Sequence, residues 1–173
     1  DKYSIMKFEF ALELNNELLM LEKNPSVNVI IITGNQQLGD FGNGFDLLES
    51  NGTLSQALFN DKIRQLENVF MRLRKPIICA INGNCIGGSL QLALMCDIVI
   101  CSDDAKFIMP ELKYGTIGAM AGQVSITIAA GKSRAMEIFG NAKPFGAHQA
   151  LEYRLVSQVH PKNQLIEKAL ALA

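Results

Sequence analysis

Three glycine-rich turns are the segments of this sequence best suited to bind a ligand or to catalyse a reaction. They read FGNGFDL from Phe41, NGNCIGGS from Asn82 and PELKYGTIG from Pro110. Each follows an apolar run expected to form a buried strand, and open α/β sheets bind ligands where strands end. Glycine lets peptide N–H groups approach a ligand closely, and the first turn of a helix has N–H groups without an internal acceptor. Two such groups aimed at one point form an oxyanion hole, although each turn alone is weak evidence.

The cysteines, histidines and serines suggest neither a metal site nor a catalytic triad. Four cysteines lie in one stretch without a C-x-x-C pair: Cys79, Cys85, Cys96 and Cys101. We expect no bound metal, and we expect these cysteines to be reduced and buried. His148 and His160 lie far downstream and are expected at the surface. Ser89 follows two glycines, but a protease triad needs a positioned histidine and none lies between Ser89 and His148.

The composition is that of a globular protein. The chain has 173 residues, of which 49% are apolar, and 16 basic residues balance 17 acidic ones. This balance excludes an electrostatic nucleic-acid binder. The longest apolar runs, such as Val29–Ile32 and Pro76–Ile81, are too short to span a membrane. Residues Asp1–Ser4 carry no signal-peptide pattern, so we expect a soluble, cytoplasmic protein.

Strands and helices are expected to alternate along the chain. The patterns predict strands over residues 27–33, 77–81, 98–101, 106–108 and 155–159. They predict helices over residues 6–21, 54–74, 90–95, 119–130, 133–139 and 146–153. This order is typical of an α/β fold with a mainly parallel sheet flanked by helices. No linker interrupts it, so residues 1–173 are expected to form a single domain.

The order and spacing of the turns resemble a known family. Residues 75–118 read KPIICAINGNCIGGSLQLALMCDIVICSDDAKFIMPELKYGTIG. This run is similar to the signature region of the crotonase superfamily, the enoyl-CoA hydratase/isomerase family. Upstream, NPSVNVIIITG and FGNGFDLLE resemble that family's strand and its F-x-A-G-x-D-L loop; downstream, GKSRAMEIFGNAKPFGAHQALEYRLVSQVHP resembles its G-K-x-x-A-M-E helix and following segment. The resemblance covers nearly the whole chain and implies the crotonase-like (ClpP/crotonase) fold of stacked ββα units.

The resemblance also implies a binding site for an acyl-coenzyme A thioester. The two oxyanion N–H groups fall on Phe45 and Gly88, where they would hold the thioester oxygen as it becomes an enolate. The substrate-binding positions that it implies are Lys2, Gly42, Asn43, Gly44, Asp46, Leu47, Ile86, Gly87 and Pro110. No separate cofactor is expected, because coenzyme A enters as part of the substrate.

The acid–base positions differ from the family's hydratases, which carry two glutamates. One is present as Glu111, and the other position holds Gln91. Glutamine can position a water but cannot ionise. The family's enoyl-CoA isomerases keep only the glutamate matching Glu111, so one-base isomerisation is favoured, with a pKa of Glu111 raised by burial. Judged by position alone, Glu111 is equally well explained as a carboxylate that stabilises the N-terminus of a helix. Gln91 is equally well explained as an ordinary helix residue.

Several alternatives stay open. A hydratase using a water held by Gln91, a decarboxylase, or a catalytically silent acyl-CoA-binding protein would carry the same two N–H groups. Three more residues depart from the family pattern: Leu48, Met120 and Arg154. Met120 replaces part of a glycine turn and is expected to narrow the pocket or exclude water, and Arg154 stands where a glycine usually ends a helix. Family members also carry an N-terminal β-hairpin and a C-terminal helical tail, which we expect this chain to lack, and they form trimers or dimers of trimers.

Overall fold

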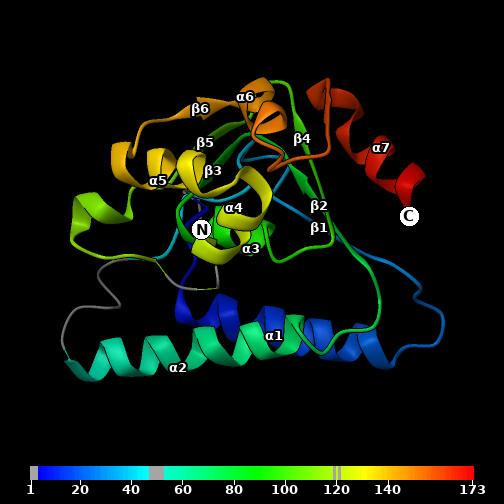
Figure 1. Ribbon diagram of the computed structural model, residues 1–173. Helices are drawn as coiled ribbons and strands as arrows, with labels where there is room; N and C mark the ends of the chain where they lie inside the picture. Colours follow the sequence, from blue (N-terminus) through cyan, green and yellow to red (C-terminus); the bar gives the residue numbers. More distant parts are fainter. Residues whose placement is uncertain (1–3, 47–52, 119, 121) are drawn as a thin grey trace.

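The computed structural model describes residues 4–46, 53–118, 120 and 122–173 (Figure 1). The helices are α1 (Phe8–Lys23), α2 (Thr53–Phe70), α3 (Gly88–Ala93), α4 (Gly122–Ala130), α5 (Lys132–Asn141), α6 (Ala147–Glu152) and α7 (Leu165–Leu172). The strands are β1 (Ile30–Thr33), β2 (Ile77–Ile81), β3 (Asn84–Ile86), β4 (Ile98–Ser102), β5 (Lys106–Ile108), β6 (Phe145–Gly146) and β7 (Gln158–His160). Two 3-10 helices, η1 (Glu111–Tyr114) and η2 (Lys162–Gln164), complete the described elements.

The strands form two sheets. The larger sheet has the order β1-β2-β4-β7 and is parallel throughout. The smaller sheet has the order β3-β5-β6, with one parallel and one antiparallel pair. The predicted α/β class with a mainly parallel sheet is therefore confirmed.

Strand β2 contributes side chains to both faces of the larger sheet. Ile78 and Ala80 pack with Leu165 and Ala169 of α7. The alternate residues Ile77, Cys79 and Ile81 face the main core. This alternation follows from the two-residue period of a strand. Helices α1 and α2 lie side by side along one side of the molecule, and α7 lies against β2 and β4 (Figure 1). None of the helices in the described ranges is long and apolar enough to cross a bilayer.

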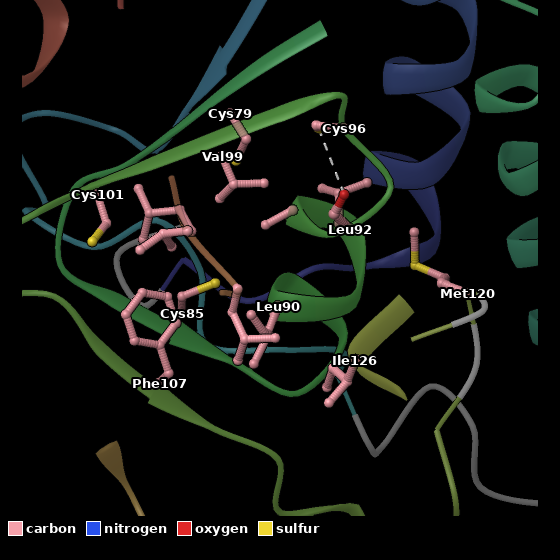
Figure 2. Close-up of a cluster of buried hydrophobic side chains, with 14 of the residues drawn as sticks. Cys79, Cys85, Leu90, Leu92, Cys96, Val99, Cys101, Phe107, Met120 and Ile126 are labelled. Carbon is pink, nitrogen blue, oxygen red and sulfur yellow. Dashed lines mark hydrogen bonds between the residues drawn. The ribbon is translucent and has the colours of Figure 1, made fainter. Parts of the chain in front are cut away.

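The cysteines belong to the main core. All four are buried and unpaired: Cys79, Cys85, Cys96 and Cys101. Figure 2 shows them among apolar side chains such as Leu90 and Phe107, and the Cys96 thiol lies 3.7 Å from the carbonyl oxygen of Leu92. Burial raises the pKa of the Cys101 thiol to about 12. The prediction that the cysteines are buried is confirmed, and thiols held in this state are poor nucleophiles.

The end of the chain differs from the sequence-based assignment. Leu155 and Val156, predicted to begin a strand, follow the turn that ends α6, and β7 starts only at Gln158. Arg154 adopts a left-handed conformation with φ 61°, and the N–H groups of Arg154 and Leu155 donate to the carbonyls of Leu151 and Ala150. These two bonds are those of a Schellman helix end. They occupy the backbone that strand pairing would need, so the prediction of a strand from residue 155 was wrong.

Strands β2 and β5 have the predicted ends, and the other predicted elements are present with shifted ends. Helix α2 ends at Phe70 rather than at residue 74, and the helix predicted from residue 119 begins at Gly122. Strands β3 and β6 and helix α7 were not predicted. Strand β3 lies inside the second glycine-rich turn, and its three-residue sequence Asn-Cys-Ile is too short to predict a strand.

Candidate active site

A cavity of about 480 Å³ lies where the three glycine-rich turns meet. Nine of its lining residues are positions that the sequence predicted: Asn43, Gly44, Phe45, Ile86, Gly87, Gly88, Gln91, Pro110 and Glu111. The third turn contributes five more, Tyr114 to Gly118, and α2 contributes Phe59 and Asn60. The paired strands β3 and β5 therefore end at the second and third of the turns that enclose the cavity.

The first turn uses almost all of its peptide N–H groups internally. Within residues 41–46 the donations are from Phe41 and Gly42 to the Asn84 carbonyl, from Asn43 to the Ser4 carbonyl, from Gly44 to Ser89 Oγ and from Asp46 to the Met6 carbonyl. The N–H of Phe45 has no acceptor among the residues that the structure describes. A peptide N–H without an acceptor in the protein is left to water or to a ligand. Because Phe45 lines the cavity, this N–H is available to a ligand bound there.

The second turn presents another free N–H. Gly87 donates to the Ile108 carbonyl over 2.8 Å, and the helical pattern of α3 begins with the bond from Gln91 N–H to the Gly87 carbonyl. Gly88 is the first residue of α3, so its N–H has no acceptor in its own helix, and it has none elsewhere in the described ranges. A Cβ at Gly88 would lie 2.2 Å from Phe45 Cε2, so the ring of Phe45 packs directly on this glycine. The two turns are thus in contact.

Glu111 is the first residue of η1, and its carboxylate reaches the second turn. Its Oε1 accepts a hydrogen bond from Gln91 Nε2 over 2.6 Å, and a Cβ at Gly87 would lie 3.1 Å from the same oxygen. Its Oε2 is buried and has no hydrogen-bond partner in the described part of the protein. Burial raises the pKa of Glu111, against the lowering effect of hydrogen bonds from its own peptide N–H and from Gln91. The cavity therefore contains a carboxylate with one anchored and one free oxygen.

Gln91 is fixed by the glycines that follow η1. It is 1% exposed. A Cβ at Gly118 would lie 2.6 Å from Gln91 Nε2, and one at Gly122 would lie 2.4 Å from Gln91 Cγ. Since these two positions leave room for the glutamine only without side chains of their own, Gln91 occupies a defined slot. It is not an ordinary exposed helix residue.

The remaining residues that the sequence predicted for the site do not line the cavity or lie outside the residues that the structure describes. Gly42 and Asp46 belong to the first turn but do not line the cavity, and Gly42 packs against Ser89, since a Cβ at Gly42 would be 2.3 Å from Ser89 Oγ. Lys2 and Leu47, like Leu48, lie outside the described residues. Neither His148 nor His160 lines the cavity. His148 is exposed, as expected, whereas His160 is partly buried.

Met120 does not line the cavity either. It is 1% exposed, and Figure 2 shows it in the buried apolar cluster with Ile126. Its φ of 54° lies in the left-handed region, which glycine adopts without strain. The expectation that Met120 narrows the pocket was therefore wrong, and the departure from the family pattern affects the backbone and the core instead.

Sequence reasoning missed the contributions of α2. Phe59 and Asn60 lie in an amphipathic helix whose pattern gives no sign of a ligand. Phe59 packs edge-on against Phe45, with 4.9 Å between ring centroids. This contact joins segments that are remote in sequence, so only the folded chain shows that α2 forms a wall of the site.

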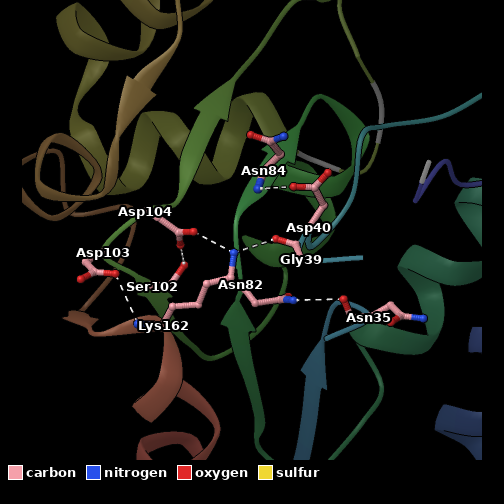
Figure 3. A network of polar contacts seen from close by, with 9 residues as sticks. All are labelled: Asn35, Gly39, Asp40, Asn82, Asn84, Ser102, Asp103, Asp104 and Lys162. Atoms are coloured by element: carbon pink, nitrogen blue, oxygen red, sulfur yellow. Dashed lines mark hydrogen bonds and ion pairs between the residues drawn. The ribbon is translucent and has the colours of Figure 1, made fainter. Parts of the chain in front are cut away.

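A polar network holds the first turn from behind (Figure 3). Lys162 Nζ donates to the Gly39 carbonyl and to Asp104 Oδ2 over 3.1 and 2.7 Å. Asp40 Oδ1 accepts the N–H of Asn84 over 3.1 Å. A Cβ at Gly83 would lie 2.0 Å from the Gly39 carbonyl oxygen, so only glycine allows this close approach. The network ties the loop before Phe41 to the turn between β2 and β3.

Comparisons with known proteins give consistent relatives. The mitochondrial enoyl-CoA hydratase of Pongo abelii is 34% identical over 161 residues, the probable mitochondrial enoyl-CoA hydratase of Dictyostelium discoideum is 38% identical over 162, and the 2,3-dehydroadipyl-CoA hydratase of Escherichia coli K12 is 35% identical over 162. These matches cover 93%, 93% and 94% of this chain, but only 55%, 57% and 63% of the relatives. The chain thus spans somewhat more than half the length of these proteins.

Solved structures share the fold. An enoyl-CoA hydratase from Bacillus anthracis has a TM-score of 0.90 at 29% identity, with 99% of this chain and 67% of that chain covered. A putative enoyl-CoA hydratase/carnithine racemase from Magnetospirillum magneticum AMB-1 also has a TM-score of 0.90 at 29% identity, with 100% and 67% covered. The crotonase-like fold expected from the sequence is confirmed. Residues 5–173 match the family described as enoyl-CoA hydratase/isomerase, and the chain belongs to that family.

Proposed function

We propose that this chain is the catalytic core of an acyl-CoA-processing enzyme that stabilises a thioester enolate and moves one proton. The observation that carries the proposal is the pairing of two features in one cavity. The N–H groups of Phe45 and Gly88 have no acceptor among the described residues, and Glu111, which lines the same cavity, has a buried oxygen without a partner among them. The arrangement suits a carbonyl that becomes negatively charged next to a carbon that loses a proton.

The favoured reaction is one-base isomerisation of an enoyl thioester. Glu111 Oε2 takes a proton from C2 of a 3-enoyl-CoA, and the released electron pair forms a dienolate whose oxygen accepts the two N–H bonds. In other enzymes, removing one oxyanion donor costs about 3 kcal/mol of transition-state stabilisation. Glu111 then returns the proton to C4, so the double bond moves from C3–C4 to C2–C3. The proton count balances, and no second base is needed.

The contact between Gln91 and Glu111 supports a single base. Gln91 donates its amide N–H to Glu111, and an amide does not ionise in the physiological range. Anchoring Oε1 leaves Oε2 as the atom that exchanges the proton. The raised pKa of Glu111 brings its two protonation states closer in energy near neutral pH, which suits a group that both removes and returns a proton.

Hydration of a 2-enoyl-CoA is the second candidate. The names of the relatives favour it, because the three described above are hydratases. In this case the carbonyl oxygen of the Gln91 side chain would orient the water and Glu111 would manage the proton. The assignments of trimeric assembly and cytoplasmic location remain predictions.

Two substrates separate the candidates. Isomerisation of a 3-enoyl-CoA creates a conjugated thioester and increases its ultraviolet absorbance, whereas hydration of a 2-enoyl-CoA removes that absorbance. We expect the purified protein to convert the 3-enoyl substrate faster. Glu111→Gln should lower kcat by a factor of about 10² or more while acyl-CoA still binds. Full activity of Glu111→Gln would remove Glu111 from the mechanism, and binding of both substrates without product would indicate a catalytically silent protein.

A further inference from the structure

Ser89 places a buried hydroxyl between the two turns that carry the free N–H groups. It is the second residue of α3 and is 1% exposed. Its Oγ accepts the N–H of Gly44 over 3.1 Å. It also lies against Gly42, where a Cβ would be only 2.3 Å from the hydroxyl oxygen. The first turn is therefore packed on this one side chain and bonded to it.

Gly44 is held at both of its polar atoms. Its N–H donates to Ser89, and its carbonyl accepts the N–H of Met6 over 2.8 Å. Its φ of +90° belongs to a region that other residues rarely adopt. A backbone with that much freedom needs external contacts to keep one orientation, and Ser89 and Met6 supply them.

The orientation of Gly44 determines the direction of the next N–H. The Gly44 carbonyl and the Phe45 N–H belong to one planar trans peptide, so they point in opposite directions. With the carbonyl bonded to Met6, the Phe45 N–H points away from Met6. A flip of this peptide plane would change only backbone dihedral angles, and it would turn the Phe45 N–H away from its present direction.

We propose that Ser89 is a positioning residue that orients the Gly44–Phe45 peptide, so that the Phe45 N–H meets the thioester oxygen of the substrate. This inference rests on the proposed function. Ser89 acts here only as a hydrogen-bond acceptor for the backbone and needs no acid–base partner. Its effect on catalysis is transmitted through Phe45.

The test measures carbonyl polarisation separately from turnover. A saturated acyl-CoA labelled with ¹³C at the thioester carbon binds without reacting, and hydrogen bonds to its oxygen lower the carbonyl stretching frequency in the infrared. We expect binding to the wild type to lower this frequency. Ser89→Ala should return the frequency toward that of free acyl-CoA and reduce kcat by about tenfold or more, with a smaller change in KM.

Ser157→Ala is the control. The Ser157 hydroxyl donates to the Val99 carbonyl over 3.0 Å, and Ser157 belongs neither to the cavity lining nor to the network of Figure 3. This variant should keep the wild-type frequency and kcat. Ser89→Cys, which places a weaker acceptor at the same position, should give an intermediate frequency and kcat, and it decides the question if Ser89→Ala does not fold.

The outcomes separate the two proposals. If the wild type lowers the carbonyl frequency but Ser89→Ala or a folded Ser89→Cys matches it in both frequency and kcat, Ser89 has no positioning role and the proposed function stands. If the wild type leaves the frequency of the bound thioester unchanged, the two N–H groups do not contact the carbonyl, and both the proposed function and the role of Ser89 are overturned.

Discussion

Gln91 donates a hydrogen bond of 2.6 Å to Glu111 across a sequence separation of 20 residues. It joins α3, which presents the free N–H of Gly88, to η1, which presents the carboxylate. The bond therefore fixes the proposed base relative to one of the proposed oxyanion donors. Its strength and its effect on the charge of Glu111 are open to direct measurement.

Removing the Gln91 donor should raise the pKa of Glu111 further. The hydrogen bond stabilises the ionised carboxylate and so lowers its pKa. Gln91→Met keeps the length of the side chain without the donor, so the acid limb of the pH dependence of kcat/KM should move to higher pH. Gln65→Met, at an exposed position of α2 with its own hydrogen bond to Asp61, is the control and should leave the profile unchanged. An unshifted acid limb in Gln91→Met would show that this contact does not act on the base.

Glu111→Gln should stabilise the fold at neutral pH while it removes activity. The folded-state pKa of Glu111 is raised, so the folded protein binds its proton more tightly than the unfolded chain does. The contribution of Glu111 to stability is then fully present below the ordinary pKa of a glutamate and is lost as pH rises through the folded-state pKa. We expect the Tm of the variant to exceed that of the wild type at pH 7 and to match it near pH 4. Equal Tm values at both pH values would contradict the raised pKa.

Gly122→Ala should disturb the slot that holds Gln91. The new methyl group would lie 2.4 Å from Gln91 Cγ, and such overpacking typically costs about 1–3 kcal/mol. Activity should fall together with stability, because the displaced glutamine no longer reaches Glu111. Gly140→Ala in α5 is the matched control, since a Cβ there meets nothing within 4 Å. That substitution should raise stability by up to about 1 kcal/mol, as expected for alanine in a helix. Chemical denaturation of both variants gives the comparison.

Arg154→Gly should make the protein more stable. Arg154 has a φ of 61° at the end of α6, a conformation that costs a non-glycine residue energy. The expected gain is about 0.5–1 kcal/mol, after allowance for the greater freedom of glycine in the unfolded chain. Arg64→Gly, within α2, should have the opposite sign and cost about 1 kcal/mol. A loss of stability in Arg154→Gly would mean that the arginine side chain makes contacts worth more than the strain.

Lys162→Met tests the network behind the first turn. Burial acts to raise the pKa of Asp104, but hydrogen bonds from Lys162 and Ser102 outweigh it and lower that pKa. The stabilisation is thus present above the ordinary pKa of an aspartate and is lost as pH falls through the folded-state pKa. Both side chains are partly exposed, so solvent screening limits the cost of the substitution at pH 7 to about 1 kcal/mol or less. The difference in unfolding free energy should shrink in acid, below about pH 4.

The helices and strands were predicted most accurately where the local sequence pattern fits only one type of secondary structure. The run IICAI, between a proline and Asn82-Gly83, matches β2 residue for residue. The apolar pair Leu155-Val156 satisfies the requirements of a strand and of a buried helix end equally, and the left-handed Arg154 decided between them. The resemblance to the family implied that Phe45, Gly88, Gln91 and Glu111 belong to one site, and all four residues line the same cavity.

The parts of the site that the sequence did not predict depend on tertiary contacts. Phe59 reaches the cavity because α2 lies across the first turn, which no periodicity within α2 indicates. Ser89 was considered only as a nucleophile, and its bond to Gly44 spans 45 residues. Met120 lies in the segment that replaces the family's glycine turn, and only the fold shows that its side chain enters the core rather than the cavity.

Because Phe45 packs closely on Gly88, the size of the side chain at one of these positions limits the size that fits at the other. Their proposed role belongs to peptide groups, which every amino acid except proline supplies, so chemistry alone leaves the side chains unconstrained. Packing does constrain them, because a methyl group at position 88 would overlap the phenyl ring. We expect compensating substitutions across the family: proteins with alanine at the position of Gly88 should carry a smaller residue at the position of Phe45.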